Sequence, residues 1–183
     1  GTNIGQHLMA VAPVCKAAFG FEPWQRVRDI AESKLSRNKM GHVKVMPFGL
    51  GEAPAFLSFL PPPEENLGIG LFTESESADK ISLEVRQGDS VMEENNIAPT
   101  LIKIDTEGFE AFVLRGLKKT LARYRPVVVF ELSDTSRKDF SSFEALQSFF
   151  PKGYTFEGIL PSRAKPKLVP FTTNRKFENL VAW

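Results

Sequence analysis

The chain has 183 residues, enough for one domain with a substantial core and short for two. Its 23 basic and 22 acidic residues give a net charge of +1, which provides no reason to expect a nucleic-acid partner. No apolar run is long enough to cross a bilayer, and the single cysteine, Cys15, fits a reducing compartment. We therefore expect a globular, cytoplasmic protein with no membrane span.

The first third of the chain predicts alternating helices and strands. Residues 1–5, GTNIG, form a glycine-bounded turn, and the helix that follows is ended or kinked by Pro13. Residues 24–39 place Val27, Ile30, Ala31 and Leu35 at helical spacing on a charged background, which is typical of an amphipathic helix. Short apolar runs before and after this helix predict strands over 17–22 and 42–49.

The remaining two thirds begin with an antiparallel excursion over 54–84, which contains a long loop at 61–80, and then return to the alternation. We expect a helix at 89–96, a strand at 100–105, one continuous helix at 110–124, a strand at 126–132 and a helix at 141–150. Two closing strands, 154–160 and 177–183, flank a basic loop at 162–176. The two long loops, 61–80 and 162–176, are our candidates for substrate contact.

Strands that alternate with helices predict a doubly wound, mostly parallel sheet with helices on both faces. No helix separates the two closing strands, so we expect them to form an antiparallel edge. An edge strand ending in Val181 and Trp183 is available to pair with a second subunit, which leaves a homo-oligomer open.

Ligands of such sheets bind beyond the carboxyl ends of the strands, where this chain places the glycine turn, Glu22, Asp105 and Glu131. Glu22 either accepts hydrogen bonds from two ribose hydroxyls or caps the following helix. The turn reads G-x-N-x-G and lacks the G-x-G-x-x-G that lets a pyrophosphate approach. This favours a nucleoside without a phosphate bridge, such as S-adenosylmethionine, over NAD.

Four segments, GTNIG, FGFEP, IKIDTEGFEAFVLRG and RPVVVFEL, together resemble the FkbM-type S-adenosylmethionine-dependent methyltransferases over residues 1–132. The resemblance implies a Rossmann-like seven-stranded sheet and O-methylation of a hydroxyl on a sugar, glycan or polyketide-like small molecule. The family pattern has a strand before the glycine turn that is missing from this sequence, so we expect one N-terminally incomplete domain over 1–183. The cofactor residues it implies are Gly1, Asn3 and Gly5 at the methionine part, Glu22 at the ribose, Phe48 and Gly49 near the adenine, and, without a stated part of the cofactor, Pro23 and Asp105.

The stretch LIKIDTEGFE, residues 101–110, carries three of the four candidate catalytic groups, Lys103, Asp105 and Glu107, and Glu131 is the fourth. Lys103 and Asp105 share one strand face, and we take Asp105 as the first choice for the base that removes the hydroxyl proton. Lys103 pairs with either Asp105 or Glu131. Glu107 is either a catalytic carboxylate or, like Glu110, a partner of the following helix dipole.

Asp105, Glu107 and Glu131 offer oxygen ligands that a divalent ion would accept, but no spacing demands one, so the prediction is that no metal is bound. His7, in the first helix, is an alternative base. Two other functions stay open. One is a non-catalytic methyltransferase-like binding module. The other is a nicotinamide-dependent oxidoreductase, against which the missing fingerprint glycine argues.

Overall fold

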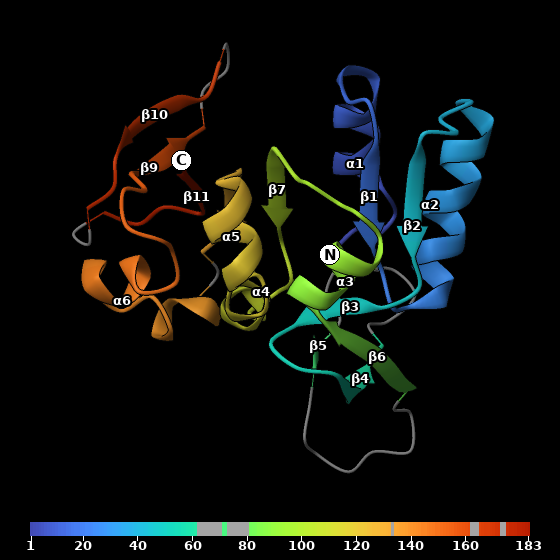
Figure 1. The fold of residues 1–183 in the computed structure, drawn as a ribbon, viewed down its shortest axis with the longest axis horizontal. Helices are drawn as coiled ribbons and strands as arrows, with labels where there is room; N and C mark the ends of the chain where they lie inside the picture. The colour runs from blue at the N-terminus through green and yellow to red at the C-terminus, as the bar shows by residue number, and fades with distance from the viewer. Residues whose placement is uncertain (62–70, 73–80, 133, 162–164, 173–174) are drawn as a thin grey trace. The chain divides into compact units, whose positions relative to one another are not determined.

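The computed structural model describes residues 1–61, 71–72, 81–132, 134–161, 165–172 and 175–183 (Figure 1). They form two compact units, Gly1–Arg86 and Gln87–Trp183. Most of the 61–80 loop and parts of the 162–176 loop lie outside the described residues, so their assignment to substrate contact stays a prediction. That both units belong to one domain is likewise a prediction.

The first unit contains a parallel strand–helix–strand motif, as the sequence predicts. Strands β1 and β2 pair in parallel, with Ala18 opposite Val43, and the helix α2 connects them. Val27, Ala31 and Leu35 are buried along one face of α2, which confirms its amphipathic pattern. The elements are α1 Gln6–Val11, the 3-10 helix η1 Ala12–Val14, β1 Ala18–Phe21, α2 Gln25–Arg37 and β2 Val43–Met46.

A four-stranded sheet with the order β3-β6-β4-β5 follows in the chain. Strand β4 pairs antiparallel with β5 and with β6, which confirms the antiparallel excursion. The strands are β3 Gly49–Gly51, β4 Ala55–Leu60, β5 Leu71–Phe72 and β6 Ile81–Gln87. Across the described residues, no helix is both long and apolar enough to cross a membrane.

The second unit is built on a five-stranded sheet with the order β10-β9-β11-β8-β7. Strands β7 and β8 run parallel, joined through the helices α4 and α5, whereas β11 is antiparallel to β8 and β9. The helices are α3 Gly88–Glu94, α4 Glu110–Gly116, α5 Lys118–Tyr124, η2 Ser136–Lys138 and α6 Phe143–Gln147. The strands are β7 Leu101–Ile104, β8 Val127–Glu131, β9 Phe156–Leu160, β10 Lys167–Pro170 and β11 Asn179–Ala182.

The single helix expected over 110–124 is two helices, because the chain breaks at Leu117. The break is explained by a contact from a distant part of the chain, since the Asp89 carboxylate accepts hydrogen bonds from the backbone N–H groups of Lys119 and Thr120 and so caps the start of α5. Phe112, in α4, is 40% exposed and so lies outside the buried face of this helix.

Two expectations for the closing segment are wrong. Residues 167–170 form β10, which pairs with β9, instead of belonging to a loop. Strand β11 is not an edge strand, because it lies between β8 and β9 and pairs with both. Val181 therefore has its backbone neighbours within this unit, and β11 offers no edge to a second subunit.

The expectation of one mostly parallel, seven-stranded sheet needs correction. The described strands form separate sheets of two, five and four strands. Of the strand pairs with a defined register, β1–β2 and β7–β8 are parallel and the others antiparallel. The two parallel pairs are the ones whose strands are connected through helices, α2 in one case and α4 with α5 in the other. What the structure supports is a mixed α/β fold. The missing first strand stays a prediction.

Candidate functional site

Three of the four predicted catalytic side chains meet beyond the carboxyl ends of β7 and β8. These strands are parallel neighbours with Ile104 opposite Phe130, so the next residues, Asp105 and Glu131, lie at the same edge. Asp105, Glu107 and Glu131 each place a carboxylate oxygen within 4.8 Å of the other two. We call this set the carboxylate cluster.

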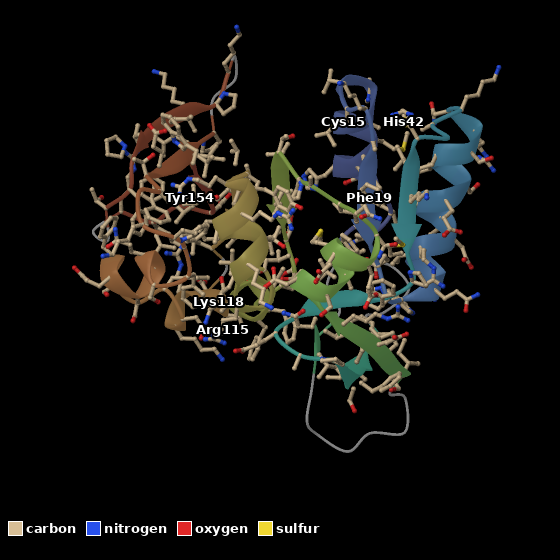
Figure 2. All side chains as sticks on the ribbon, in the orientation of Figure 1. Cys15, Phe19, His42, Arg115, Lys118 and Tyr154 are labelled. Atoms are coloured by element: carbon tan, nitrogen blue, oxygen red, sulfur yellow. The ribbon has the colours of Figure 1, made fainter. Side chains whose placement is uncertain are left out.

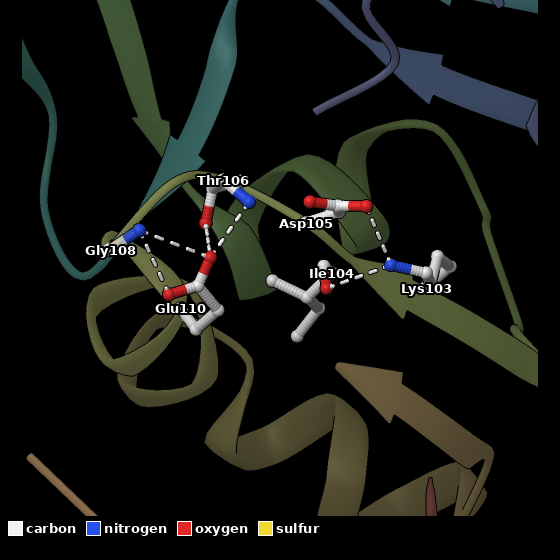
Figure 3. Close-up of polar contacts among 6 residues, drawn as sticks. All are labelled: Lys103, Ile104, Asp105, Thr106, Gly108 and Glu110. Carbon is white, nitrogen blue, oxygen red and sulfur yellow. Dashed lines mark hydrogen bonds and ion pairs between the residues drawn. The ribbon is translucent and has the colours of Figure 1, made fainter. Parts of the chain in front are cut away.

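The fourth predicted residue, Lys103, supplies the positive charge beside the cluster. Its Nζ lies 2.9 Å from Oδ2 of Asp105 and also donates a 3.5 Å hydrogen bond to the Ile104 carbonyl (Figure 3). Of the two pairings that the sequence leaves open, the structure therefore has Lys103 with Asp105. Both side chains are more than a quarter exposed, so the pair orients Asp105 more than it stabilises the fold.

Glu131 is the member of the cluster with the most unusual environment. Its Oε2 is buried and has no hydrogen-bond partner among the residues that the structure describes. Burial, and then the negative charges of Asp105, Glu107 and Glu110, raise the pKa of Glu131 to about 7, with Lys103 acting in the opposite direction. Glu131 therefore exchanges a proton near neutral pH, as a general base must.

Glu107 enters the cluster from the tight turn at residues 106–108, which leads from β7 to α4. Its backbone has a left-handed φ of 51°, which is uncommon outside glycine. Partial burial, Asp105 and Glu110 raise the pKa of the Glu107 carboxyl, although much of the side chain is exposed.

Glu110 is the site residue whose importance the sequence reasoning missed. It is fully buried, and its carboxylate accepts hydrogen bonds from Thr106 N, Thr106 Oγ1 and Gly108 N at 2.7 to 3.3 Å (Figure 3). A signal was present, because Glu110 shares the i, i+3, i+4, i+7 spacing of the buried residues Val113, Leu114 and Leu117.

The glycine turn (residues 1–5) in the first unit has two left-handed residues, Asn3 at φ 48° and Gly5 at φ 81°. Gly5 also packs closely on α2, since a Cβ at this position would lie 3.1 Å from the Cβ of Ala31. A glycine is therefore required here both by the backbone conformation and by the close approach of the helix.

Glu22 joins the end of β1 to this turn. It is 7% exposed, its Oε2 accepts a 2.7 Å hydrogen bond from Asn3 N, and its Oε1 accepts a 3.1 Å hydrogen bond from Trp24 N. A carboxylate has about four acceptor sites, so two are left for further donors. These sites suit the hydroxyls of a ribose, and the ribose role stays a prediction.

The predicted adenine contacts lie around β3. Phe48 is 5% exposed, with its ring centroid 6.1 Å from that of Phe21 and 4.2 Å from the Arg86 guanidinium carbon. Its ring is therefore enclosed by protein, and only its backbone is a candidate for ligand contact. Gly49 starts β3 close to Pro23, whose Cγ lies 3.7 Å from where a Cβ on Gly49 would be.

Cys15 and His42 lie at one end of the first unit (Figure 2). His42 Nε2 is 2.9 Å from the Ala12 carbonyl oxygen, which also accepts the Cys15 backbone N–H. His42 thus has a structural role here, and His7, the alternative base, is exposed on α1.

These features define a class: a mixed α/β protein with a glycine turn and with carboxylates at the ends of parallel strands. A solved structure of methyltransferase FkbM from Methylobacillus flagellatus KT has a similar fold, with a TM-score of 0.66 and 20% identity over 100% of this chain and 42% of that chain. The family model described as methyltransferase FkbM domain matches residues 1–157. The chain belongs to this family.

Among curated proteins, hexuronic acid methyltransferase AglP from Haloferax volcanii is 29% identical over 133 residues, which are 70% of this chain and 52% of AglP. The chain thus spans about half the length of the proteins that it matches.

Proposed function

We propose that this chain is the S-adenosylmethionine-binding and catalytic part of a methyltransferase that methylates a hydroxyl of a sugar, glycan or other small molecule. Membership of the FkbM family supports the reaction class. The name of the relative AglP, a hexuronic acid methyltransferase, supports a sugar-type acceptor. The cytoplasmic location also belongs to this proposal.

The first unit holds the cofactor in this proposal, and S-adenosylmethionine supplies the methyl group when bound. Glu22 uses its two remaining acceptor sites for the ribose hydroxyls, while two others hold Asn3 N and Trp24 N. Gly1, Asn3 and Gly5 lie along the methionine part. Pro23, Gly49 and the backbone of Phe48 lie along the adenine.

The second unit removes the proton of the acceptor hydroxyl. The observation that carries this step is the buried, unpartnered Oε2 of Glu131, which we assign as the proton acceptor. Sequence reasoning put Asp105 first, but Asp105 is ion-paired with Lys103, which suits it to orient the acceptor instead. Glu107 adds negative charge beside Glu131 and keeps its proton affinity high.

No resident metal is part of the proposal, because Lys103 already places a positive charge beside the carboxylate cluster. Treating the enzyme with EDTA and then adding Mg²⁺ checks this point. We expect the same methylation rate in both samples. A rate that is lost with EDTA and restored by Mg²⁺ would show that the carboxylate cluster binds a metal ion.

The first experiment is calorimetry of the full-length natural protein titrated with S-adenosylhomocysteine, beside a Glu22→Ala variant. We expect micromolar binding that the variant loses. Acceptors, beginning with hexuronic acid glycans, are then screened for methylation, with Asp105→Asn and Glu131→Gln as controls. A folded protein that binds no S-adenosylhomocysteine would favour the partner-binding module, and one that binds NADH instead would favour the oxidoreductase.

A further inference from the structure

Glu110 lies beneath the 106–108 turn, in the part of the second unit that carries the carboxylate cluster (Figure 3). We propose that Glu110 is a positioning residue, whose buried carboxylate holds this turn and thereby presents Glu107 to Asp105 and Glu131. This inference rests on the proposed function, because the cluster is the site to which we assign proton removal.

The hydrogen bonds of Glu110 show what it holds. Oε1 accepts from Thr106 N at 2.7 Å and from Thr106 Oγ1 at 2.9 Å, and Oε2 accepts from Gly108 N at 3.1 Å. A fully buried carboxylate is costly unless donors surround it, and here those donors are the two ends of the turn. Removing the carboxylate leaves both backbone N–H groups without their acceptor.

The turn needs this support because its backbone is strained. Glu107 and Gly108 both have left-handed φ angles, 51° and 102°. Such a conformation in a non-glycine residue persists only when its surroundings enforce it. On its other side the turn is limited by Thr135, since a Cβ on Gly108 would lie 2.9 Å from the Thr135 Cβ. Glu110 and Thr135 together restrict the turn, so that the Glu107 carboxylate stays within the carboxylate cluster.

Glu110 also acts through its charge. Its negative charge contributes to the raised pKa of both Glu107 and Glu131, after the larger effects of burial and Asp105. Loss of this charge alone lowers both pKa values, even if the turn stays in place. A variant that weakens the turn and keeps the Glu110 carboxylate is therefore needed as well.

The test compares Glu110→Gln with Asp89→Asn in the full-length protein. Asp89 is a matched control, because its carboxylate also accepts three hydrogen bonds, from Lys119 N, Thr120 N and Thr120 Oγ1, but it caps α5. The measurement is a pH titration of the side-chain carboxyls by NMR, with ¹³C-labelled glutamate. We expect the Glu131 midpoint, near 7 in the unmodified protein, to fall in Glu110→Gln and to stay unchanged in Asp89→Asn.

This titration needs no methyl acceptor, so it tests Glu110 even if the proposed methylation fails. Where methylation is measurable, Glu110→Gln should lower kcat by about 10²-fold with little change in the acceptor KM, as expected when a reacting group is displaced. The proposal is overturned if the Glu131 midpoint does not move, or if Asp89→Asn moves it equally.

A milder variant covers the case in which Glu110→Gln does not fold. Thr106→Val removes only the hydroxyl donor and keeps the backbone bond at 2.7 Å. We expect kcat to fall several-fold and the Glu107 carboxyl resonance to shift. Unchanged values of both would contradict the proposal.

Discussion

The two units each place a glutamate at the carboxyl end of a parallel strand, and they treat it in opposite ways. In the first unit, Glu22 follows β1 and has a backbone N–H on each carboxylate oxygen. In the second unit, Glu131 ends β8, and its buried Oε2 accepts no hydrogen bond from the described part of the chain. Glu22 and Glu131 thus share a residue type and a position at a strand end, but they differ in the number of hydrogen-bond donors around the carboxylate.

The difference shows how donors decide the role of a carboxylate. Each carboxylate oxygen of Glu22 accepts a hydrogen bond from a backbone N–H group, so Glu22 is suited to hold a turn and a neutral polyol. Glu131 lacks these bonds and has three other acids nearby, so its ionised form is disfavoured and it takes up a proton near pH 7. We therefore assign binding to Glu22 and proton transfer to Glu131.

Replacing Glu131 by glutamine should have the largest effect. Glutamine cannot accept the hydroxyl proton, and general-base catalysis contributes about 10²–10⁴-fold, so we expect kcat to fall by that factor. Calorimetry should show unchanged S-adenosylhomocysteine affinity, because Glu131 is not among the proposed cofactor contacts. A near-normal kcat in this variant would indicate that Asp105, and not Glu131, removes the hydroxyl proton.

Glu22→Gln should show the opposite pattern. Glutamine keeps the shape of the side chain but removes its charge and one acceptor, and hydrogen bonds to charged groups contribute about 1.5–3 kcal/mol. We expect about tenfold to hundredfold weaker S-adenosylhomocysteine binding by calorimetry, with kcat at saturating cofactor largely kept. Equal losses in affinity and in kcat would contradict the division of roles.

Alanine substitutions at Gly5 and Gly108 test how much the stability of each unit depends on the glycine in its turn. Gly5 and Gly108 both have left-handed φ angles, and a Cβ would lie 3.1 Å from Ala31 in one case and 2.9 Å from Thr135 in the other. Each substitution should lower the free energy of unfolding by about 1–3 kcal/mol, with the larger loss at Gly108. Urea unfolding measures both. A neutral Gly108→Ala would show that the 106–108 turn relaxes freely.

The last prediction is a pH dependence of stability. The pKa of Glu131 is raised from 4.5 to about 7 on folding, so the folded protein keeps a proton that the unfolded chain releases. This contribution to stability therefore falls as pH rises from 4.5 to 7 and is constant above. We measure the Tm of Glu131→Gln and of the unmodified protein between pH 4.5 and 7. The Tm of the variant minus that of the unmodified protein should increase with pH. A difference that stays constant would mean that Glu131 has an ordinary pKa.

Much of the local structure and the members of the cluster could be predicted from sequence. The spacing of Val27, Ala31 and Leu35 predicts α2, and the strand ends predict where Asp105 and Glu131 meet. The helix depends on periodicity, which is a local property, and the cluster follows from the rule that the carboxyl ends of parallel strands lie at one edge of a sheet.

The rest depends on contacts between distant segments. The break at Leu117 arises because Asp89, about 30 residues earlier, caps α5. Strand β10 and the central place of β11 follow from pairings that no local pattern specifies. Glu110 was assigned to the helix dipole because the donors that surround it, Thr106 and Gly108, are visible only once the turn is formed.

The position of β11 has a consequence for how the second unit is assembled. This strand follows β9 and β10 in the chain but lies between β8 and β9 in the sheet. During synthesis, β8 and β9 therefore emerge with facing edges open and pair fully only after Asn179–Ala182 has been made. A chain cut before Asn179 exposes two apolar strand edges, so it should aggregate or engage chaperones instead of forming a smaller stable sheet.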